Sequence, residues 1–413
     1  MSIGIVGAGI SGLHLALRLQ QFGIATTLYT AQEPDGIRSG PPLNFVTRFD
    51  STRRREKALG VTRWLSAAYD NAWMHMSVEG PGGFVLRGRL PAPASSVDFR
   101  MYLAELLETY TGRGGDTVLR RLGGGTELAR TAGDHDLLVV AAGRSAPAEV
   151  FGRDPDRSPY RTAPRLLAGG LFHGIAPADP PGMTMHMVPG AGEIHAPAYH
   201  SFSGPVTAVL IEAVPEGPFA AVTDGHRNDP EGFTREVLKL ITRHAPLLRE
   251  RVDARTFALA RPVDMLQGAL TPVVRRGWAE LDGGGHALAI GDAWITNDPL
   301  TAQGANLGSK LAFQLADELR DHRGAYDGEF CRAVSERMWA TARPVVDWTN
   351  LFIGTPQPQV AALLTAAAGD QRVADAFVAN LDRPDAMWRV VSAPERVEEF
   401  IARSQSRTVR SGV

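Results

Sequence analysis

The 413-residue sequence has almost no cysteine and no long apolar run. Cys331 is the only cysteine, so the chain cannot form an internal disulfide. No apolar run approaches the roughly 20 residues that a membrane-spanning helix needs. The first residues read as a β-strand and not as a secretory signal, which together with the single cysteine predicts a cytoplasmic location.

An excess of charge of either sign is also absent. Lys and Arg number 43 against 45 Asp and Glu, so the net charge of -2 favours neither nucleic acid nor an anionic membrane as partner. His186, His195 and His200 lack the usual spacing of zinc ligands, and no metal site is predicted. The hydrophobic content of 44% is ordinary for a soluble enzyme, and the length predicts two closely linked domains.

The clearest motif lies at the start of the chain. Residues 3–6 read as a short buried strand, followed by Gly7, Gly9 and Gly12 in the spacing G-x-G-x-x-G and then by a helical pattern. Such glycines permit a tight turn, close approach to a pyrophosphate and close packing of helix on strand. The free N–H groups of the helix N-terminus also attract phosphate. The motif therefore predicts dinucleotide contacts from Gly7, Gly9, Ile10, Ser11 and Gly12.

The second predicted strand, residues 26–29, lacks the usual acid at its end. Dinucleotide folds generally carry Asp or Glu there to bind a ribose hydroxyl. This chain has Thr30 at that position, and Glu33 comes three residues later. Two interpretations stay open. Either the contact is missing and the cofactor exchanges readily, or Glu33 or a backbone group replaces it.

Two further buried strands end in small or acidic residues. Residues 136–143 form an apolar run that ends in a small pair, and residues 287–290 precede a Gly-Asp pair and a loop that leads into a helix from about residue 307 to 319. An acid after a buried strand can bind a sugar hydroxyl, and backbone N–H groups before a helix can hold a ring edge. The residues predicted to contact the cofactor here are Ala142, Gly143, Asp292, Pro299, Gln303, Gly304, Ala305 and Asn306.

Arg100 is a further candidate for the cofactor site. It lies in the first turn of a helix that Asp98 is predicted to cap. There its guanidinium could meet a pyrophosphate, and a surface salt bridge is the equally weighted alternative.

These three pieces in this order resemble the class A flavoprotein monooxygenases, which have the p-hydroxybenzoate hydroxylase fold. Finer features are similar to the oxygenase component of styrene and indole monooxygenases. They include Asn44 with Val46, the absence of the ribose acid at Thr30, and segments 97–100, 264–268, 348–350 and 392–396. The resemblance spans nearly the whole chain.

The resemblance implies an α/β fold with a Rossmann-like FAD-binding domain, an inserted antiparallel β-sheet domain and a helical C-terminal region. Residues 165–280 alternate apolar and polar positions between Pro and Gly breaks, as an inserted β domain would. The expected division is 1–164 and 281–345 for the two parts of the FAD domain, 165–280 for the substrate domain and 346–413 for the helical region.

The family also implies a two-component reaction. A separate NADH-dependent flavin reductase supplies reduced FAD, so NADH acts only through that partner. Reduced FAD and O2 form a flavin C4a-(hydro)peroxide, which epoxidises an aromatic alkene. The chain has no second G-x-G-x-x-G for NAD(P)H. The alternative is a single-component NAD(P)H-dependent aromatic hydroxylase of the same fold, and a homodimer is a family expectation.

Such chemistry needs a dry pocket and no nucleophile, so no catalytic side chain is assigned. Asn44 and Val46 match pocket positions of the family, and Leu43, Met185 and Met187 are candidates from their apolar context. Where the styrene-type pocket tends to carry an aromatic, a His and a Ser, this chain has Asn71, Met74 and Ala94. Ala94 and Met74 favour an indole-type pocket, whereas Asn44 and Val46 favour a styrene-type one. The substrate stays open between styrene, indole and another aromatic alkene, and plain core is the alternative for each residue.

Overall fold

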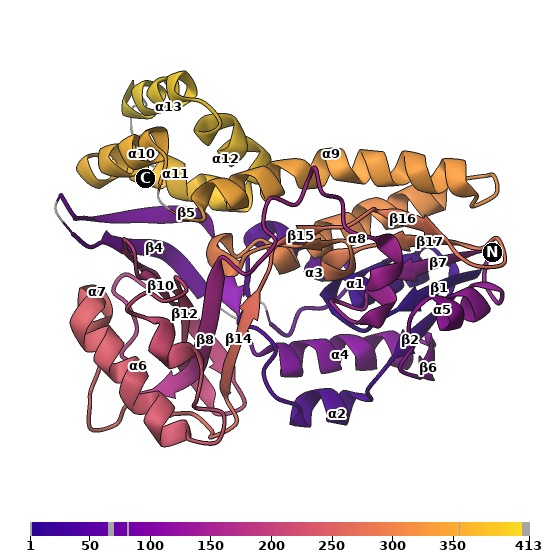
Figure 1. Cartoon of the computed structure of the whole chain (residues 1–413), viewed down its shortest axis with the longest axis horizontal. Helices are drawn as coiled ribbons and strands as arrows, with labels where there is room; N and C mark the ends of the chain where they lie inside the picture. Colours follow the sequence, from indigo (N-terminus) through magenta and orange to yellow (C-terminus); the bar gives the residue numbers. More distant parts are fainter. Residues whose placement is uncertain (1, 65–69, 81, 355, 407–413) are drawn as a thin grey trace.

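Two β-sheets lie at opposite ends of an elongated molecule, and helices join and cover them. The structure, a computed structural model, describes residues 2–64, 70–80, 82–354 and 356–406. Figure 1 shows the N-terminal sheet at one end and the larger sheet at the other, with the long helix α9 (Gly328–Phe352) running between them. Within those residues, no helix is both long enough and apolar enough to cross a membrane.

The N-terminal sheet has the topology of a dinucleotide-binding domain. Its six strands lie in the order β16 (Trp278–Glu280), β17 (His286–Ala289), β7 (Leu137–Val140), β1 (Ser2–Val6), β2 (Ala25–Thr30) and β6 (Asp116–Leu119). All pairings are parallel except that of β16 with β17. Strands β1 and β7 are apolar and almost wholly buried, as strands covered on both faces must be. The helices of this half are α1 (Ile10–Gln21), α2 (Pro34–Ser39), α3 (Asp50–Ala58), α4 (Phe99–Gly112), α5 (Gly125–Ala132), α8 (Gly304–Asp321) and α9.

The register of this sheet brings distant parts of the sequence together. Val6 of β1 lies opposite Val140 of β7, and Val140 lies opposite Ala289 of β17. Because parallel strands end at the same edge of a sheet, the turns after these three strands converge there. The expected meeting of the opening glycine turn with the later Gly-Asp pair is therefore observed.

The second sheet contains ten strands. They run in the order β13 (Ala258–Leu259), β8 (Arg165–His173), β12 (Gly204–Ala213), β10 (Gly192–Ala196), β9 (Gly182–Val188), β4 (Asp70–Val78), β5 (Phe84–Ser96) and β3 (Thr47–Arg48), with β11 (Ala198–Ser201) paired to β12 and β14 (Met265–Leu270) to β8. Most pairs are antiparallel, but β4 and β9 are parallel. A small separate sheet joins β15 (Val273–Val274) to β18 (Ile295–Thr296).

This sheet extends beyond the expected residues 165–280. Three of its strands, β3, β4 and β5, come from residues 47–96, which the sequence assigned to the first part of the FAD domain. The apolar side chains of β4 explain the difference. Met74 lies opposite Met183 of β9 and Met76 lies opposite Met185, so both strands bury their methionines in one cluster.

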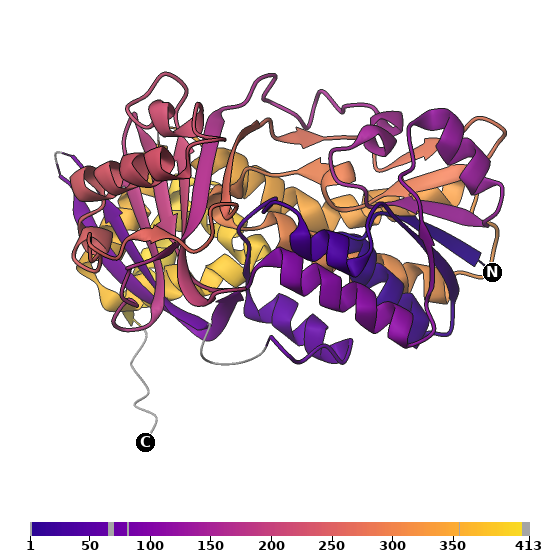
Figure 2. The ribbon, with the colours of Figure 1, turned by 90° about the horizontal axis from the view of Figure 1, so that it is seen from below.

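Different helices cover the two faces of the larger sheet. On one face α6 (Pro230–His244) packs through Phe233, Val237 and Ile241, with the short α7 (Pro246–Arg249) after it. On the methionine face lie the end of α9 and the C-terminal helices α10 (Pro358–Gly369), α11 (Gln371–Ala379), α12 (Pro384–Val391) and α13 (Pro394–Ser406). Figures 1 and 2 show these two groups of helices on opposite sides of the sheet.

Candidate functional site

The turn between β1 and α1 is shaped by glycines with two different roles. A Cβ atom on Gly7 would lie 2.6 Å from the Ala141 carbonyl oxygen, and one on Gly12 would lie 2.0 Å from that of Gly7. These two glycines therefore let strand and helix pack closely. Around Gly9 the nearest atom would be 3.9 Å away, which leaves room for a ligand. The helical hydrogen bonds of α1 begin with Leu13 N–H to Gly9, so the N–H groups of Ile10, Ser11 and Gly12 face outward as an anion site.

Asp292 follows β17 at the same edge of the sheet. The buried Ser11 side chain packs between Gly291 and Gly308. Its Oγ would lie 2.6 Å from a Cβ on Gly291 and 2.3 Å from a Cβ on Gly308. Thus α1, the Gly-Asp turn and α8 meet at Ser11. Burial raises the pKa of Asp292, and the positive charges of Arg144 and Arg275 oppose this shift.

Arg144 and Arg275 are cations that the sequence analysis missed. Arg144 directly follows Gly143 after β7, so its place beside a predicted phosphate site was the signal that could have identified it. Arg275 lies after β15, and its Nη1 donates to the Asp292 carbonyl oxygen at 3.3 Å. Its proximity to the site depends on a strand pairing that no local pattern reveals.

The loop before α8 is held in one conformation by its own residues. The Asp298 carboxylate accepts a hydrogen bond from Leu300 N–H at 3.1 Å and so caps the 3₁₀ turn Pro299–Thr301. Ala302 then adopts a left-handed conformation with φ of 54°. Helix α8 begins at Gly304, where no atom lies within 4 Å of the position of a Cβ. Its first N–H groups, from Gly304 to Asn306, are the backbone donors expected beside a flavin ring.

The side chains of Asn306 and Gln303 bind protein, not an open site. The Asn306 Oδ1 accepts from Phe49 N–H and the Thr52 hydroxyl, and its Nδ2 donates to the carbonyls of Thr47 and Ala302. Four bonds use the whole capacity of the amide. The Gln303 Nε2 donates to the carbonyl oxygens of Thr301 and Leu381, and the residue is buried. The Asn306 amide is thus fully used within the protein, and the Gln303 donors hold the loop.

Arg100 and Thr30 are likewise engaged within the protein. Arg100 is buried, and its guanidinium donates to Asp98 and, at 2.6 Å, to Asp264. This pair joins α4 to the segment before β14, so Arg100 forms a buried ion pair in place of the expected pyrophosphate contact or surface salt bridge. The Thr30 hydroxyl donates to the Gln32 carbonyl at 2.8 Å, and Glu33 is exposed. Neither side chain reproduces the usual ribose acid.

A buried chain of hydrogen bonds lies behind the glycine turn. Tyr102 OH donates to Glu56 at 2.8 Å, and Glu56 also receives Arg48 Nη1 at 2.6 Å. His14 lies between Tyr102, 2.8 Å from its Nε2, and Ser309, 2.9 Å from its Nδ1. Because Tyr102 already gives its proton to Glu56, His14 must donate from Nε2 and accept at Nδ1. Burial lowers the pKa of His14 to about 3, in keeping with this neutral form.

This edge of the sheet fits a flavin dinucleotide. Open space lies over Gly9, Gly143 and Gly304, because a Cβ at each of them would meet no atom closer than 3.9 Å. Outward N–H groups of α1 and the cations Arg144 and Arg275 suit a pyrophosphate, and the Asp292 carboxylate suits the hydroxyls of ribitol. Ala142 is partly exposed at the same edge and Ala305 in the first turn of α8.

The residues predicted for the substrate pocket fall into two groups. Met74, Met185 and Met187 are buried in one cluster with Leu300 of the loop before α8, residues 298–303, which we call the flavin loop. Asn71 lies directly opposite the buried Ala94. The Asn71 amide forms two hydrogen bonds with the backbone of Ala198, at 3.2 Å and 3.1 Å, and so connects β4 to β11. The second group is Leu43, Asn44 and Val46, on the extended segment before β3. Leu43 is 80% exposed and Asn44 is exposed, whereas Val46 is partly buried. The structure does not enclose Leu43 or Asn44 in a pocket.

An acidic cluster next to the flavin loop was also missed. Glu193 of β10 lies opposite Met187 and also opposite Glu212 of β12, so these carboxylates share a face with the methionines. Glu212 and Asp298 are both buried. The expected surroundings were almost purely apolar. Glu212 interrupts the apolar run 208–213, and a charged residue within a buried strand is the signal that could have revealed the cluster.

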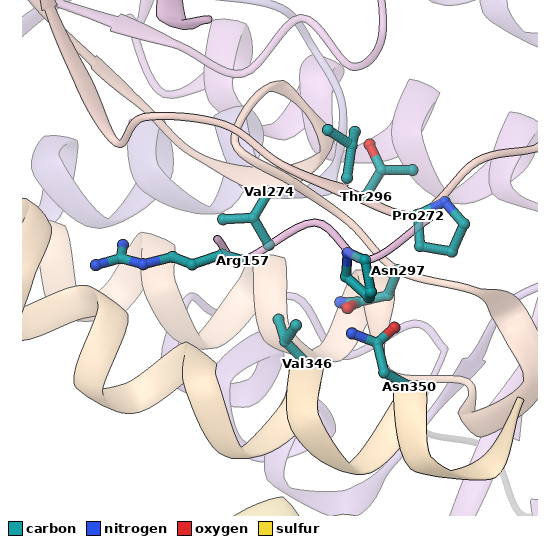
Figure 3. A pocket seen from close by; sticks show the side chains of 9 residues that line it. Arg157, Pro272, Val274, Thr296, Asn297, Val346 and Asn350 are labelled. Carbon is teal, nitrogen blue, oxygen red and sulfur yellow. The ribbon is translucent and has the colours of Figure 1, made fainter. Parts of the chain in front are cut away.

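A small cavity lies between α9 and the strand before Asp298. Figure 3 shows its lining, which includes Arg157, Thr296, Asn297, Val346 and Asn350. Its volume of about 10 Å³ holds roughly one water molecule and no aromatic substrate. Asn350 belongs to segment 348–350, one of those similar to the styrene and indole monooxygenases.

Comparisons with known proteins identify relatives of this chain. The family model "Styrene monooxygenase A putative substrate binding domain" matches residues 143–251. Styrene monooxygenase StyA of Pseudomonas fluorescens and that of a Pseudomonas species are each 33% identical over 403 residues, covering 96% of this chain and 97% of theirs.

Solved structures show the same fold at low identity. The flavin-dependent brominase Bmp2 aligns with a TM-score of 0.66 at 11% identity, over 98% of this chain and 100% of that chain. Pseudomonas aeruginosa PqsL with 2-aminobenzoylacetate aligns with a TM-score of 0.60 at 14% identity, over 95% and 100%. The expected α/β fold is thereby confirmed. Since the relatives at 33% identity span nearly the whole chain, this protein belongs to the styrene monooxygenase family.

Proposed function

We propose that this protein is the oxygenase component of a two-component system that epoxidises an aromatic alkene of the styrene or indole type. Reduced FAD comes from a separate NADH-dependent reductase, and bound reduced flavin supplies the activated oxygen after it reacts with O2. The observation that carries the proposal is the convergence of Gly9, Asp292 and the Pro299 loop at one sheet edge, next to a methionine-lined sheet face.

The residues of the chain bind the flavin, orient its ring and keep water away from it. The N–H groups of α1 and the cations Arg144 and Arg275 hold the pyrophosphate, and Asp292 binds ribitol hydroxyls. Backbone N–H groups at the start of α8 orient the ring edge. Met185, Met187 and Leu300 exclude water beside the ring, which protects the activated oxygen and places an apolar alkene near it.

The lack of an acidic residue at the end of β2 supports delivery of the flavin from solution. The Thr30 hydroxyl is turned toward Gln32, so the second strand offers no carboxylate to the ribose. A cofactor that lacks this contact exchanges more readily, as a reduced flavin supplied by another protein must.

Product analysis with an added flavin reductase, NADH, FAD and O2 tests the proposal. Styrene should give styrene oxide, or indole should give indigo, and omission of the reductase should abolish the product. Oxidation of NAD(P)H by this chain alone upon addition of a phenolic substrate would favour the single-component hydroxylase instead. Formation of hydrogen peroxide alone with both alkenes would contradict the proposal.

A further inference from the structure

The acidic cluster lies where the larger sheet meets the flavin loop. Glu193 and Glu212 lie on neighbouring strands, and Asp298 lies in the flavin loop directly before Pro299. Arg165 of β8 binds Glu193 through two hydrogen bonds of 3.0 Å and 3.1 Å. The remaining titratable groups that face the cluster are His195 of β10 and Tyr160.

The charges in this cluster do not balance if every acid is ionised. Arg165 neutralises Glu193, and among the residues that the structure describes no further cation pairs with Glu212 or Asp298. His195 Nε2 lies 3.2 Å from Glu212 Oε1, but burial lowers the pKa of His195 and favours its neutral form. The Glu212 and Asp298 carboxyl groups lie within hydrogen-bonding reach of each other. Two adjacent buried carboxylates without compensation are strongly unfavourable.

The oxygen atoms of the two acids also lack donors. Both carboxylate oxygens of Glu212 and the Oδ2 of Asp298 are buried and accept no hydrogen bond from the described residues. The other oxygen of Asp298, Oδ1, accepts the hydrogen bond from Leu300 N–H. Buried oxygens of this kind are normally paired, and a single proton between the two carboxyl groups would pair them with each other.

We propose that Glu212 and Asp298 share one proton and so form a buried acid–carboxylate bridge that fastens the flavin loop to the substrate sheet. One carboxyl group donates its O–H to the ionised oxygen of the other. No covalent bond forms or breaks, and loss of the proton leaves two like charges that push the loop and the sheet apart. Burial raises the pKa of both carboxyl groups, and the negative charge of Glu212 raises the pKa of Asp298 further, so the pair keeps a proton at neutral pH.

The bridge makes both acids positioning residues. Asp298 sets the 3₁₀ turn that leads to Ala302 and α8, and Glu212 is anchored in the centre of the sheet between β8 and β10. The role of the loop in seating the flavin rests on the proposed function, whereas the shared proton does not.

Infrared spectroscopy of the flavin-free protein tests the proton directly. At neutral pH the wild type should show the C=O stretch of a protonated carboxylic acid, and this band should decrease as the solution is made more alkaline. Both Glu212→Gln and Asp298→Asn should abolish it, while Glu250→Gln, at an exposed residue of the same domain, should retain it. A band unchanged by both variants, or no band in the wild type, would overturn the proposal. The second result would place the proton on His195.

Reduced-FAD binding across pH tests the positioning role. The dissociation constant of the wild type should rise by about tenfold per pH unit above the pKa of the pair, as one linked proton requires. Glu212→Gln keeps a donor toward Asp298 at every pH, so its binding should vary with pH no more than the flavin itself dictates. Glu250→Gln should follow the wild type. Identical pH profiles for wild type and Glu212→Gln would refute the bridge, whereas failure to form epoxide with normal flavin binding would count against the proposed function alone.

Discussion

Gly9 and Gly12 show how one residue type meets two demands within four positions. A methyl group on Gly12 would collide with the Gly7 carbonyl oxygen at 2.0 Å, whereas one on Gly9 would point into open space. We therefore expect Gly12→Ala to lower the free energy of unfolding by roughly 3 kcal/mol, the upper end for overpacking. Gly9→Ala should lower it by at most about 1 kcal/mol, the effect of a poorer helix cap.

Flavin titration should separate the same two variants. Because the proposed function places the pyrophosphate beside Gly9, Gly9→Ala should weaken FAD binding by about tenfold in a protein that stays folded. Denaturant unfolding and flavin fluorescence measure the two effects. Normal flavin affinity in Gly9→Ala would show that this turn does not carry the pyrophosphate.

Because His14 is buried in its neutral form, we expect the free energy of unfolding to decrease in mild acid. Its folded pKa of about 3 lies below the unfolded value of 6.5, so the unfolded chain binds more protons in this range. Its contribution is complete above pH 6.5 and falls as the pH decreases toward 3, by up to about 1.4 kcal/mol per pH unit. Denaturant unfolding of His14→Gln should lack this part of the slope, and His173→Gln, at an exposed histidine, should keep it. Equal slopes in wild type and His14→Gln would contradict the assignment.

Helix α8 depends on Asn306 for its position against β3 and α3. Three of the four hydrogen bonds of its amide reach Thr47, Phe49 and Thr52, more than 250 residues away in the sequence. Asn306→Ala would leave several buried groups unpaired, and we expect it to lower the free energy of unfolding by about 3 kcal/mol or more. Asn350→Ala, whose amide makes no hydrogen bond within the described part of the chain, should lower it by less than about 1 kcal/mol. Similar values for the two variants in urea unfolding would exclude this role.

The same helix illustrates what sequence patterns can predict. The glycine turn, the strand ends and the presence of α8 were predictable because they depend on local requirements: a conformation, a close approach or a free N–H group. The start of α8 was not, since it begins at Gly304 and not at about residue 307. The partners of Arg100, Gln303 and Asn306 were not, since Asp264, Leu381 and Thr47 reach them only through the tertiary fold. The side chains of Arg100, Gln303 and Asn306 hold together the elements around the predicted cofactor site.

At the scale of the molecule, the larger sheet joins both halves of the chain. Its strands from residues 47–96 pair with those from 165–270, so the substrate face is not a separable insert. The hairpin of β4 and β5 was predictable, but the parallel pairing of β4 with β9 was not, because no local pattern specifies a partner more than 100 residues away. The acidic cluster arises in the same way, where three distant segments meet beside the Pro299 loop.

A single-turnover reaction with chemically reduced FAD tests the central claim most directly. The protein is mixed anaerobically with reduced FAD and then exposed to O2 and styrene or indole, with no reductase and no nicotinamide present. The account predicts epoxide, or indigo from indole, in an amount that approaches the reduced FAD bound. Absence of product here, together with product formation from NAD(P)H and the chain alone, would contradict it.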